Sequence, residues 1–170
     1  MKIYLVLNGN GTGCGMRLFL AGTENRRYVL DDVANLRPYI LESFYTVEKN
    51  KCAVDMLKYY GDYLLDSGAF TFMNSGGHEN WEEYLERYAN FINCNNIQKF
   101  FELDIDSIVG YDKVKEFRSR LERLTNRQSI PVWHISRGKE EFARMCQEYS
   151  YVAIGGIVTK EITPEKYKYF

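Results

Sequence analysis

Four places in the sequence carry groups that could bind a polar ligand or move a proton, and each follows a short apolar run. The runs end at Asp66, at Asp104, at His134 and at the pair Gly155 and Gly156. Carboxylates and imidazoles are common acid–base groups in proteins, and neighbouring glycines let a ligand approach the backbone closely. These residue types together favour recognition of a polar heterocycle and proton transfer to it.

The run that ends at Asp66 is followed by further candidate ligand contacts. Ser67 adds a hydroxyl, Gly68 keeps the backbone free of bulk, and Phe70 offers a face on which a flat ligand could stack. Each acidic or basic candidate also has a purely structural explanation, because Asp66 could cap a turn, Asp104 could cap a loop and His134 could be a satisfied buried histidine. Their shared position at the ends of successive runs favours the functional interpretation.

The elements that would position these groups alternate between strand and helix. This alternation is typical of a parallel sheet with right-handed crossovers. It predicts an α/β fold of the (β/α)8 TIM-barrel type, an incomplete barrel of about six βα units over residues 16–170 that is truncated at the C-terminus, and an N-terminal extension or extra strand over residues 1–15. In such a barrel the carboxyl ends of the strands form the ligand-binding rim. The strands are expected at 18–21, 40–47, 62–66, 99–104, 130–134 and 151–156.

Composition narrows the function classes. The 170 residues carry a formal net charge of −1, which gives no overall attraction to nucleic acid. The four cysteines form no CxxC pair, which favours reduced thiols, and the apolar runs are too short to cross a bilayer. We therefore expect a cytoplasmic protein without membrane contact.

One predicted helix is rich in arginine. Four basic side chains could meet phosphates, namely Arg118, Arg120, Arg123 and Arg127. The acidic residues Glu116 and Glu122 are interleaved with them. This interleaving favours a solvated, salt-bridged helix face.

Several of these motifs resemble the tRNA-guanine transglycosylases. The stretch from Asp66 to Phe70 reads Asp-Ser-Gly-Ala-Phe and is similar to the family's DSGGF-type motif. The segment around Asp104 resembles the base-binding aspartate strand, and Ala153 to Gly156 resembles the glycine-pair strand. His134 stands where the family has a glutamine. The resemblance covers about residues 16–170 and is nearest to relatives from phages and mobile elements.

The resemblance implies an activity and a role for each residue. The family exchanges a guanine in nucleic acid for a 7-deazaguanine through a covalent enzyme–sugar intermediate. By resemblance, Asp66 is the catalytic residue that handles the proton, with Ser67 and Gly68 beside it and Phe70 stacked on the base. Asp104 would read the amine and amide edge of the base, His134 would replace the glutamine at that edge, and Gly155 and Gly156 would contact its carbonyl. The partners implied are a purine or 7-deazapurine base and either tRNA or DNA.

The sequence departs from the family in ways that leave alternatives open. Neither the family's nucleophilic aspartate nor its cysteine/histidine zinc site is found, so we expect no metal, no cofactor and no turnover by this chain alone. One alternative is a non-catalytic base-binding or partner subunit. Another is an unrelated barrel enzyme that uses an Asp/Asp/His rim. An incomplete barrel would also leave open sheet edges, which predicts self-association or a covering partner chain.

Overall fold

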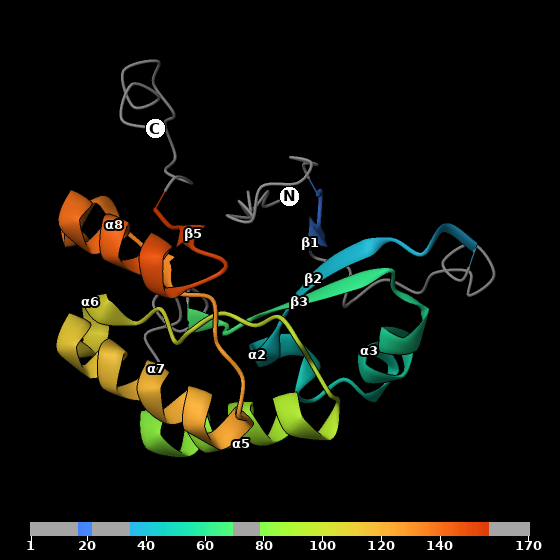
Figure 1. Ribbon diagram of the computed structural model, residues 1–170. Helices are drawn as coiled ribbons and strands as arrows, with labels where there is room; N and C mark the ends of the chain where they lie inside the picture. The colour runs from blue at the N-terminus through green and yellow to red at the C-terminus, as the bar shows by residue number, and fades with distance from the viewer. Residues whose placement is uncertain (1–16, 22–34, 70–78, 157–170) are drawn as a thin grey trace.

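The computed structural model describes residues 17–21, 35–69 and 79–156 and contains only parallel strand pairs within them. Strands β1 (Leu20–Ala21), β2 (Tyr39–Ser43) and β3 (Asp62–Asp66) form one sheet in chain order, and β4 (Val132–Trp133) pairs with β5 (Ala153–Ile154). Figure 1 shows these strands above the helices α5 (Trp81–Cys94) and α7 (Tyr111–Thr125). The predicted extension 1–15 and Phe70 lie outside the described residues.

The predicted (β/α)8 barrel is wrong. The described residues form parallel sheets of three and two strands and no closed barrel. Residues 99–104, predicted as a full strand, form isolated bridges only, from Phe100 to Leu65 and from Phe101 to Ile130. Alternating strands and helices specify parallel pairing and the crossovers between strands, but they set neither the number of strands nor closure. The alternation of strands and helices therefore predicts the order of the elements along the chain but not the architecture of the sheets.

The bridging segment nevertheless links the two sheets through backbone hydrogen bonds. The amide of Phe101 donates to the Leu65 carbonyl at 3.0 Å, and the amide of Ile130 donates to the Phe100 carbonyl at 2.8 Å. The amide of Gly155 donates to the Trp133 carbonyl at 2.8 Å. The chain segments that end at Asp66, Asp104, His134 and Gly155 are thus neighbours in that order.

Asparagine side chains cap the starts of two of the described helices. Asn80 caps α5 by accepting a hydrogen bond from the Glu83 amide at 3.5 Å. The strand expected over 40–47 ends instead at Ser43, and Phe44 begins the short helix α2. The described helices are α2 (Phe44–Val47), α3 (Lys51–Met56), α5 (Trp81–Cys94), α6 (Asp106–Val109), α7 (Tyr111–Thr125) and α8 (Lys139–Glu148), with the 3₁₀ turns η1 (Leu57–Tyr59) and η2 (Ile135–Arg137).

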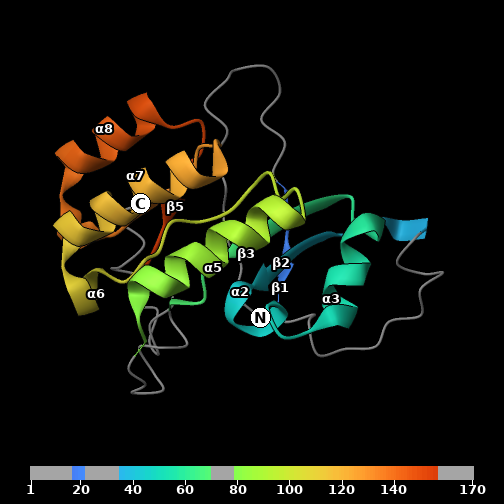
Figure 2. The ribbon, with the colours of Figure 1, turned by 90° about the horizontal axis from the view of Figure 1, so that it is seen from below.

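The main core forms where α5 and α7 pack beneath the strands, and Figure 2 shows these two helices side by side. Tyr88 of α5 is completely buried, and its hydroxyl lies 3.2 Å from the Leu65 carbonyl and 3.0 Å from the Phe101 carbonyl. One helix side chain thereby reaches both β3 and the bridging segment. This contact stabilises the part of the structure that carries Asp66 and Asp104.

We predict that Tyr88→Phe lowers the free energy of unfolding by about 1 to 2 kcal/mol, because two buried carbonyls lose a hydroxyl partner while the ring is retained. Urea denaturation followed by circular dichroism measures the change. An unchanged midpoint would show that the Tyr88 hydroxyl does not support the bridging segment.

Candidate functional site

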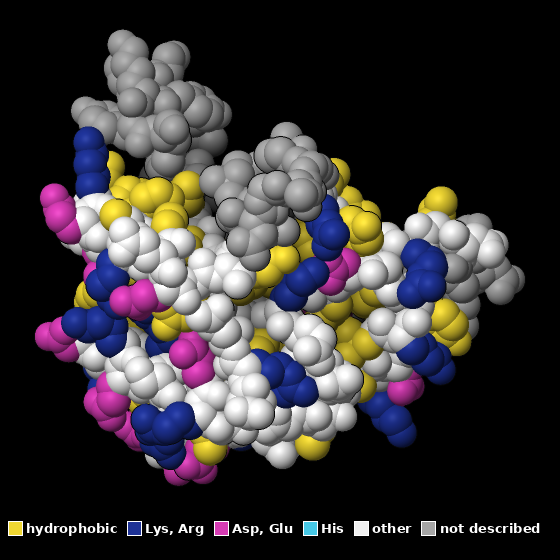
Figure 3. Space-filling view, viewed as in Figure 1, with side chains coloured by type: hydrophobic (Ala, Val, Ile, Leu, Met, Phe, Trp, Pro, Cys, Tyr) yellow, Lys and Arg dark blue, Asp and Glu magenta, His cyan; other side chains and the backbone are white. Residues whose placement is uncertain are grey.

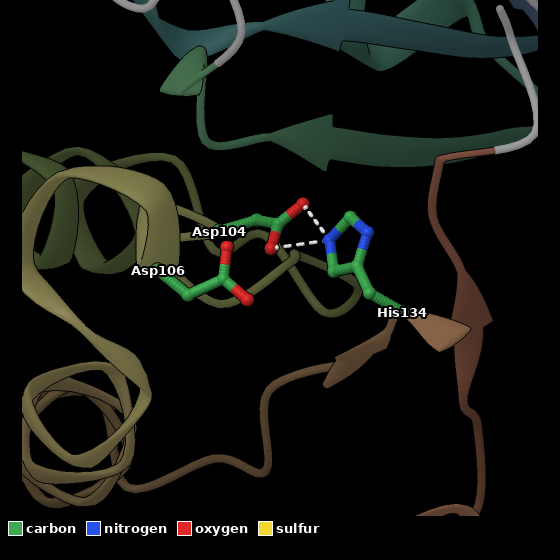
Figure 4. Close-up of side chains that lie close together, drawn as sticks. All are labelled: Asp104, Asp106 and His134. Carbon is green, nitrogen blue, oxygen red and sulfur yellow. Dashed lines mark hydrogen bonds and ion pairs between the residues drawn. The ribbon is translucent and has the colours of Figure 1, made fainter. Parts of the chain in front are cut away.

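The closest pair among the predicted site residues is Asp104 and His134. The His134 Nε2 atom lies 2.8 Å from each oxygen of the Asp104 carboxylate. Figure 4 shows the two side chains pointing toward each other, with Asp106 beside them at the start of α6. Both side chains remain partly exposed, at 23% for His134 and 22% for Asp104. The pair is therefore accessible to a ligand.

The hydrogen bond from Nε2 to Asp104 raises the pKa of His134, although partial burial acts in the opposite direction. Asp104 can only accept, so Nε2 carries a proton in this arrangement. Within the described residues the other ring nitrogen, Nδ1, forms no hydrogen bond. His134 can consequently hold one proton against Asp104 and exchange another with a ligand.

Because Gly155 has no side chain, the His134 ring can occupy the space beside it. A Cβ atom at Gly155 would lie 2.8 Å from His134 Nε2 and even closer to Cε1, which is well inside van der Waals contact. Gly156 has a φ of +74° and faces His134 Nδ1, with 3.4 Å between that nitrogen and a Cβ built on the glycine. The structure therefore brings Asp104, His134, Gly155 and Gly156 together.

The Asp66 end of β3 forms a separate set of contacts. Asp66 pairs in register with Ser43, and the carbonyl of Ser67 accepts a hydrogen bond from the Tyr84 hydroxyl at 2.7 Å. Burial and then the charges of Glu48 and Asp66 raise the pKa of Tyr84. Among the described residues, no hydrogen bond joins Asp66 to Asp104 or to His134.

Ser67 and Gly68 lie in a tightly packed turn after Asp66. Ser67 is 0% exposed, and its hydroxyl has no hydrogen-bond partner among the residues that the structure describes. Gly68 has a φ of +81°, and a Cβ there would lie 2.7 Å from the Cβ of Tyr45. Close packing thus explains the glycine at this position. Among the described residues, the buried hydroxyls of Ser67 and of the neighbouring Ser43 are both open for a further hydrogen bond.

Arg137 is the residue that the sequence interpretation missed. It lies three positions after His134, at the end of η2, and its side chain is 2% exposed. Its guanidinium donates to Asp104 Oδ1 at 3.2 Å and to Asp106 Oδ2 at 3.1 Å. It also donates to Glu102 Oε1 at 3.0 Å.

Glu102 anchors this network. Its side chain is 0% exposed, and it accepts hydrogen bonds from Arg118 Nε at 2.6 Å and from the Val132 amide at 2.8 Å. Arg118 is itself buried, so the expectation of a solvated arginine face is wrong at this position. An acid inside the apolar run Phe100–Leu103 was the available signal, because a buried carboxylate requires cationic or hydrogen-bonding partners.

Asp104, Asp106 and His134 also satisfy the spacing of a metal site, since one ligand-type atom from each lies within 4.8 Å of the others. Arg137, however, already forms ion pairs with both carboxylates. A second cation about 4 Å from a guanidinium would be opposed by several kcal/mol at an effective dielectric constant near 20. We therefore interpret the cluster as an ion-paired acid–base site.

The surface around these elements carries charges of both signs. Figure 3 shows Lys and Arg side chains interspersed with Asp and Glu side chains on the face that it presents. Arg120, for example, pairs with Glu82 and Glu86. None of the described helices has the length and apolar character needed to cross a bilayer.

Comparisons with known proteins were made against family models, curated proteins and solved structures. No family model matches the chain, and neither a curated protein nor a solved structure matches it. The geometry and charges of Asp104, His134 and their neighbours are therefore the basis for assigning a function.

We predict that Gly155→Ala separates His134 from Asp104 and lowers the pKa of His134 toward its ordinary value, because the added methyl group needs the space of the imidazole ring. Nuclear magnetic resonance (NMR) titration of the His134 ring measures this pKa. Gly156→Ala is the control, since its methyl group strains the backbone without overlapping the ring. An unshifted His134 pKa in Gly155→Ala would contradict the assigned role of Gly155.

The raised pKa of His134 also makes stability depend on pH. A group whose pKa is raised by folding contributes stability in full below its unfolded pKa, about 6.5 for histidine, and loses it as the pH rises through the folded value. We expect the free energy of unfolding to fall over that interval in the wild-type chain and to fall less in His134→Gln. Urea denaturation at a series of pH values tests this, with His78→Gln as the control for the other histidine. Equal pH dependence in the wild type and His134→Gln would contradict it.

Proposed function

We propose that the chain binds a guanine or 7-deazaguanine base at Asp104, His134 and Gly155, and that this is the recognition step of a transglycosylase-like base exchange in tRNA or DNA. The observation that carries the proposal is the convergence of these three residues at the ends of neighbouring parallel segments. Ligands of parallel α/β sheets bind at such carboxyl ends.

The chemistry of the site fits the donor edge of such a base. Guanine presents an amine and a ring N–H side by side, and a carboxylate can accept both hydrogen bonds. Its neighbouring carbonyl can accept from the Gly156 backbone amide, which lies close to His134, whereas the Gly155 amide already donates to the Trp133 carbonyl. When the base binds, the Asp104 carboxylate would exchange its hydrogen bonds with the His134 imidazole for hydrogen bonds with the base.

His134 would then serve as the acid–base group. When a base leaves its sugar, one of its ring nitrogens must gain a proton, and a protonated imidazole beside the base can supply it. The hydrogen bond to Asp104 raises the pKa of His134 and so favours the protonated imidazole. Asp66 remains the proposed catalytic carboxylate at the neighbouring strand end, with Phe70 as the proposed stacking residue.

One observation favours a non-catalytic base-binding subunit as a second candidate function. Each acid in the cluster around His134, namely Glu102, Asp104 and Asp106, accepts a hydrogen bond from Arg137. A carboxylate held by a guanidinium is a weak nucleophile, because the cation stabilises its charge. This cluster can therefore recognise a base without attacking the sugar.

We predict that Asp104→Asn weakens binding of 7-deazaguanine by about 2 kcal/mol or more, because a charged acceptor is lost and an amide donor then faces the donors of the base. Isothermal titration calorimetry measures the affinity, with adenine as the ligand that presents the wrong edge. Asp106→Asn is the matched control, since it also loses a bond to Arg137 but leaves the Asp104–His134 pair in place. Equal affinity in the wild type and Asp104→Asn would overturn the proposed site.

The two candidate functions differ in base exchange. We predict that the chain alone binds the base but does not incorporate labelled guanine into tRNA or duplex DNA, because the acids around His134 are held by Arg137. Filter-bound radioactivity after incubation measures incorporation. Incorporation that disappears in Asp66→Asn would instead make this chain the exchanging enzyme.

A further inference from the structure

Arg137 uses its whole hydrogen-bonding capacity inside the protein. A guanidinium has five N–H donors, and five hydrogen bonds from Arg137 are present. Nε donates to Asp106, Nη1 to Glu102 and to the Val132 carbonyl, and Nη2 to Asp104 and to Asp106. No donor of Arg137 is left for a ligand.

The surroundings of Arg137 keep it in place. Glu102 is fully buried: its Oε1 accepts from the Val132 amide as well as from Arg137, and its Oε2 accepts from Arg118. The guanidinium carbon of Arg137 also lies 4.2 Å from the centroid of the Tyr111 ring, which covers it as a cation–π partner. Arg137 is therefore a rigid cation that extends from the buried Glu102 to the partly exposed Asp104.

We propose that Arg137 is a positioning residue that holds the Asp104 carboxylate at the base-binding edge and keeps His134 able to release its proton. The inference rests on the function proposed above. Arg137 donates a hydrogen bond to Oδ1 of Asp104 at 3.2 Å, so the carboxylate has a fixed orientation. The charge that faces a ligand is then the carboxylate and not the guanidinium, which favours a ligand that donates hydrogen bonds over an anion.

The charges around His134 show how Arg137 acts on the proton. Asp104 and Asp106 favour the protonated imidazole and raise the pKa of His134, whereas Arg137 opposes protonation and lowers it. Without Arg137, two carboxylates would hold the imidazolium more tightly, and His134 would release its proton less readily. The titration of His134 therefore measures the effect of the Arg137 charge on this proton.

The test compares the His134 titration in three variants by NMR of ligand-free protein. The expected result for Arg137→Gln is an upward shift of the His134 pKa, because a cation is removed from the site. Arg118→Gln is the matched control, since it also removes a buried partner of Glu102 but has no contact with Asp104; its His134 pKa is expected to stay unchanged. Arg137→Lys retains the charge, so its His134 pKa is expected to stay near the wild-type value. An unchanged or lowered pKa in Arg137→Gln would overturn the proposal.

Calorimetry with 7-deazaguanine gives a second readout on the same variants. Lysine has three donors on one nitrogen and cannot reproduce the forked guanidinium, whose separate nitrogens bond Glu102, Asp104 and Asp106. Arg137→Lys is therefore expected to bind the base about tenfold more weakly. Equal affinity in Arg137→Lys and the wild type would show that Arg137 does not position Asp104.

If no variant and no wild-type protein binds a base, the proposed function fails, while the titration of His134 still decides the role of Arg137. If Arg137→Gln does not fold, Arg137→Lys alone carries the affinity test.

Discussion

The buried carboxylate of Glu102 is the interaction on which the rest of the site depends. Burying an unpaired carboxylate costs several kcal/mol, so Glu102 requires partners that stay in place. Burial raises its pKa, while Arg118, Arg137 and the Val132 amide act in the opposite direction and favour the charged form. These partners come from α7, from η2 and from the start of β4. One carboxylate therefore fixes the relative positions of three elements around the strand ends.

The charge balance of the cluster follows from this anchor. Three carboxylates, from Glu102, Asp104 and Asp106, face two guanidiniums, from Arg118 and Arg137. Protonation of His134 makes the total neutral, whereas a neutral His134 leaves one negative charge. Gain or loss of a proton at His134 is thus a change in the net charge of the whole site, which suits an acid–base group beside a donor-rich ligand.

The sequence predicted the local order of the chain better than its architecture. The strand ending at Asp66 and the convergence of Asp104 with His134 follow from short-range patterns and from parallel pairing. The predicted barrel failed because closure depends on strand number and tilt, which periodicity does not encode. Arg137 was missed because its partners lie about thirty residues away in the chain, and a surface arginine has the same local pattern.

The most direct test of the account is a crystal structure of the chain with 7-deazaguanine bound. We expect the amine edge of the base to lie against the Asp104 carboxylate and its carbonyl to face the backbone at Gly155 and Gly156. The His134 ring should have moved away from Asp104. Arg137 should keep its contacts with Glu102 and Asp104. A base bound elsewhere, or an Asp104–His134 pair that stays closed at saturating ligand, would contradict the account.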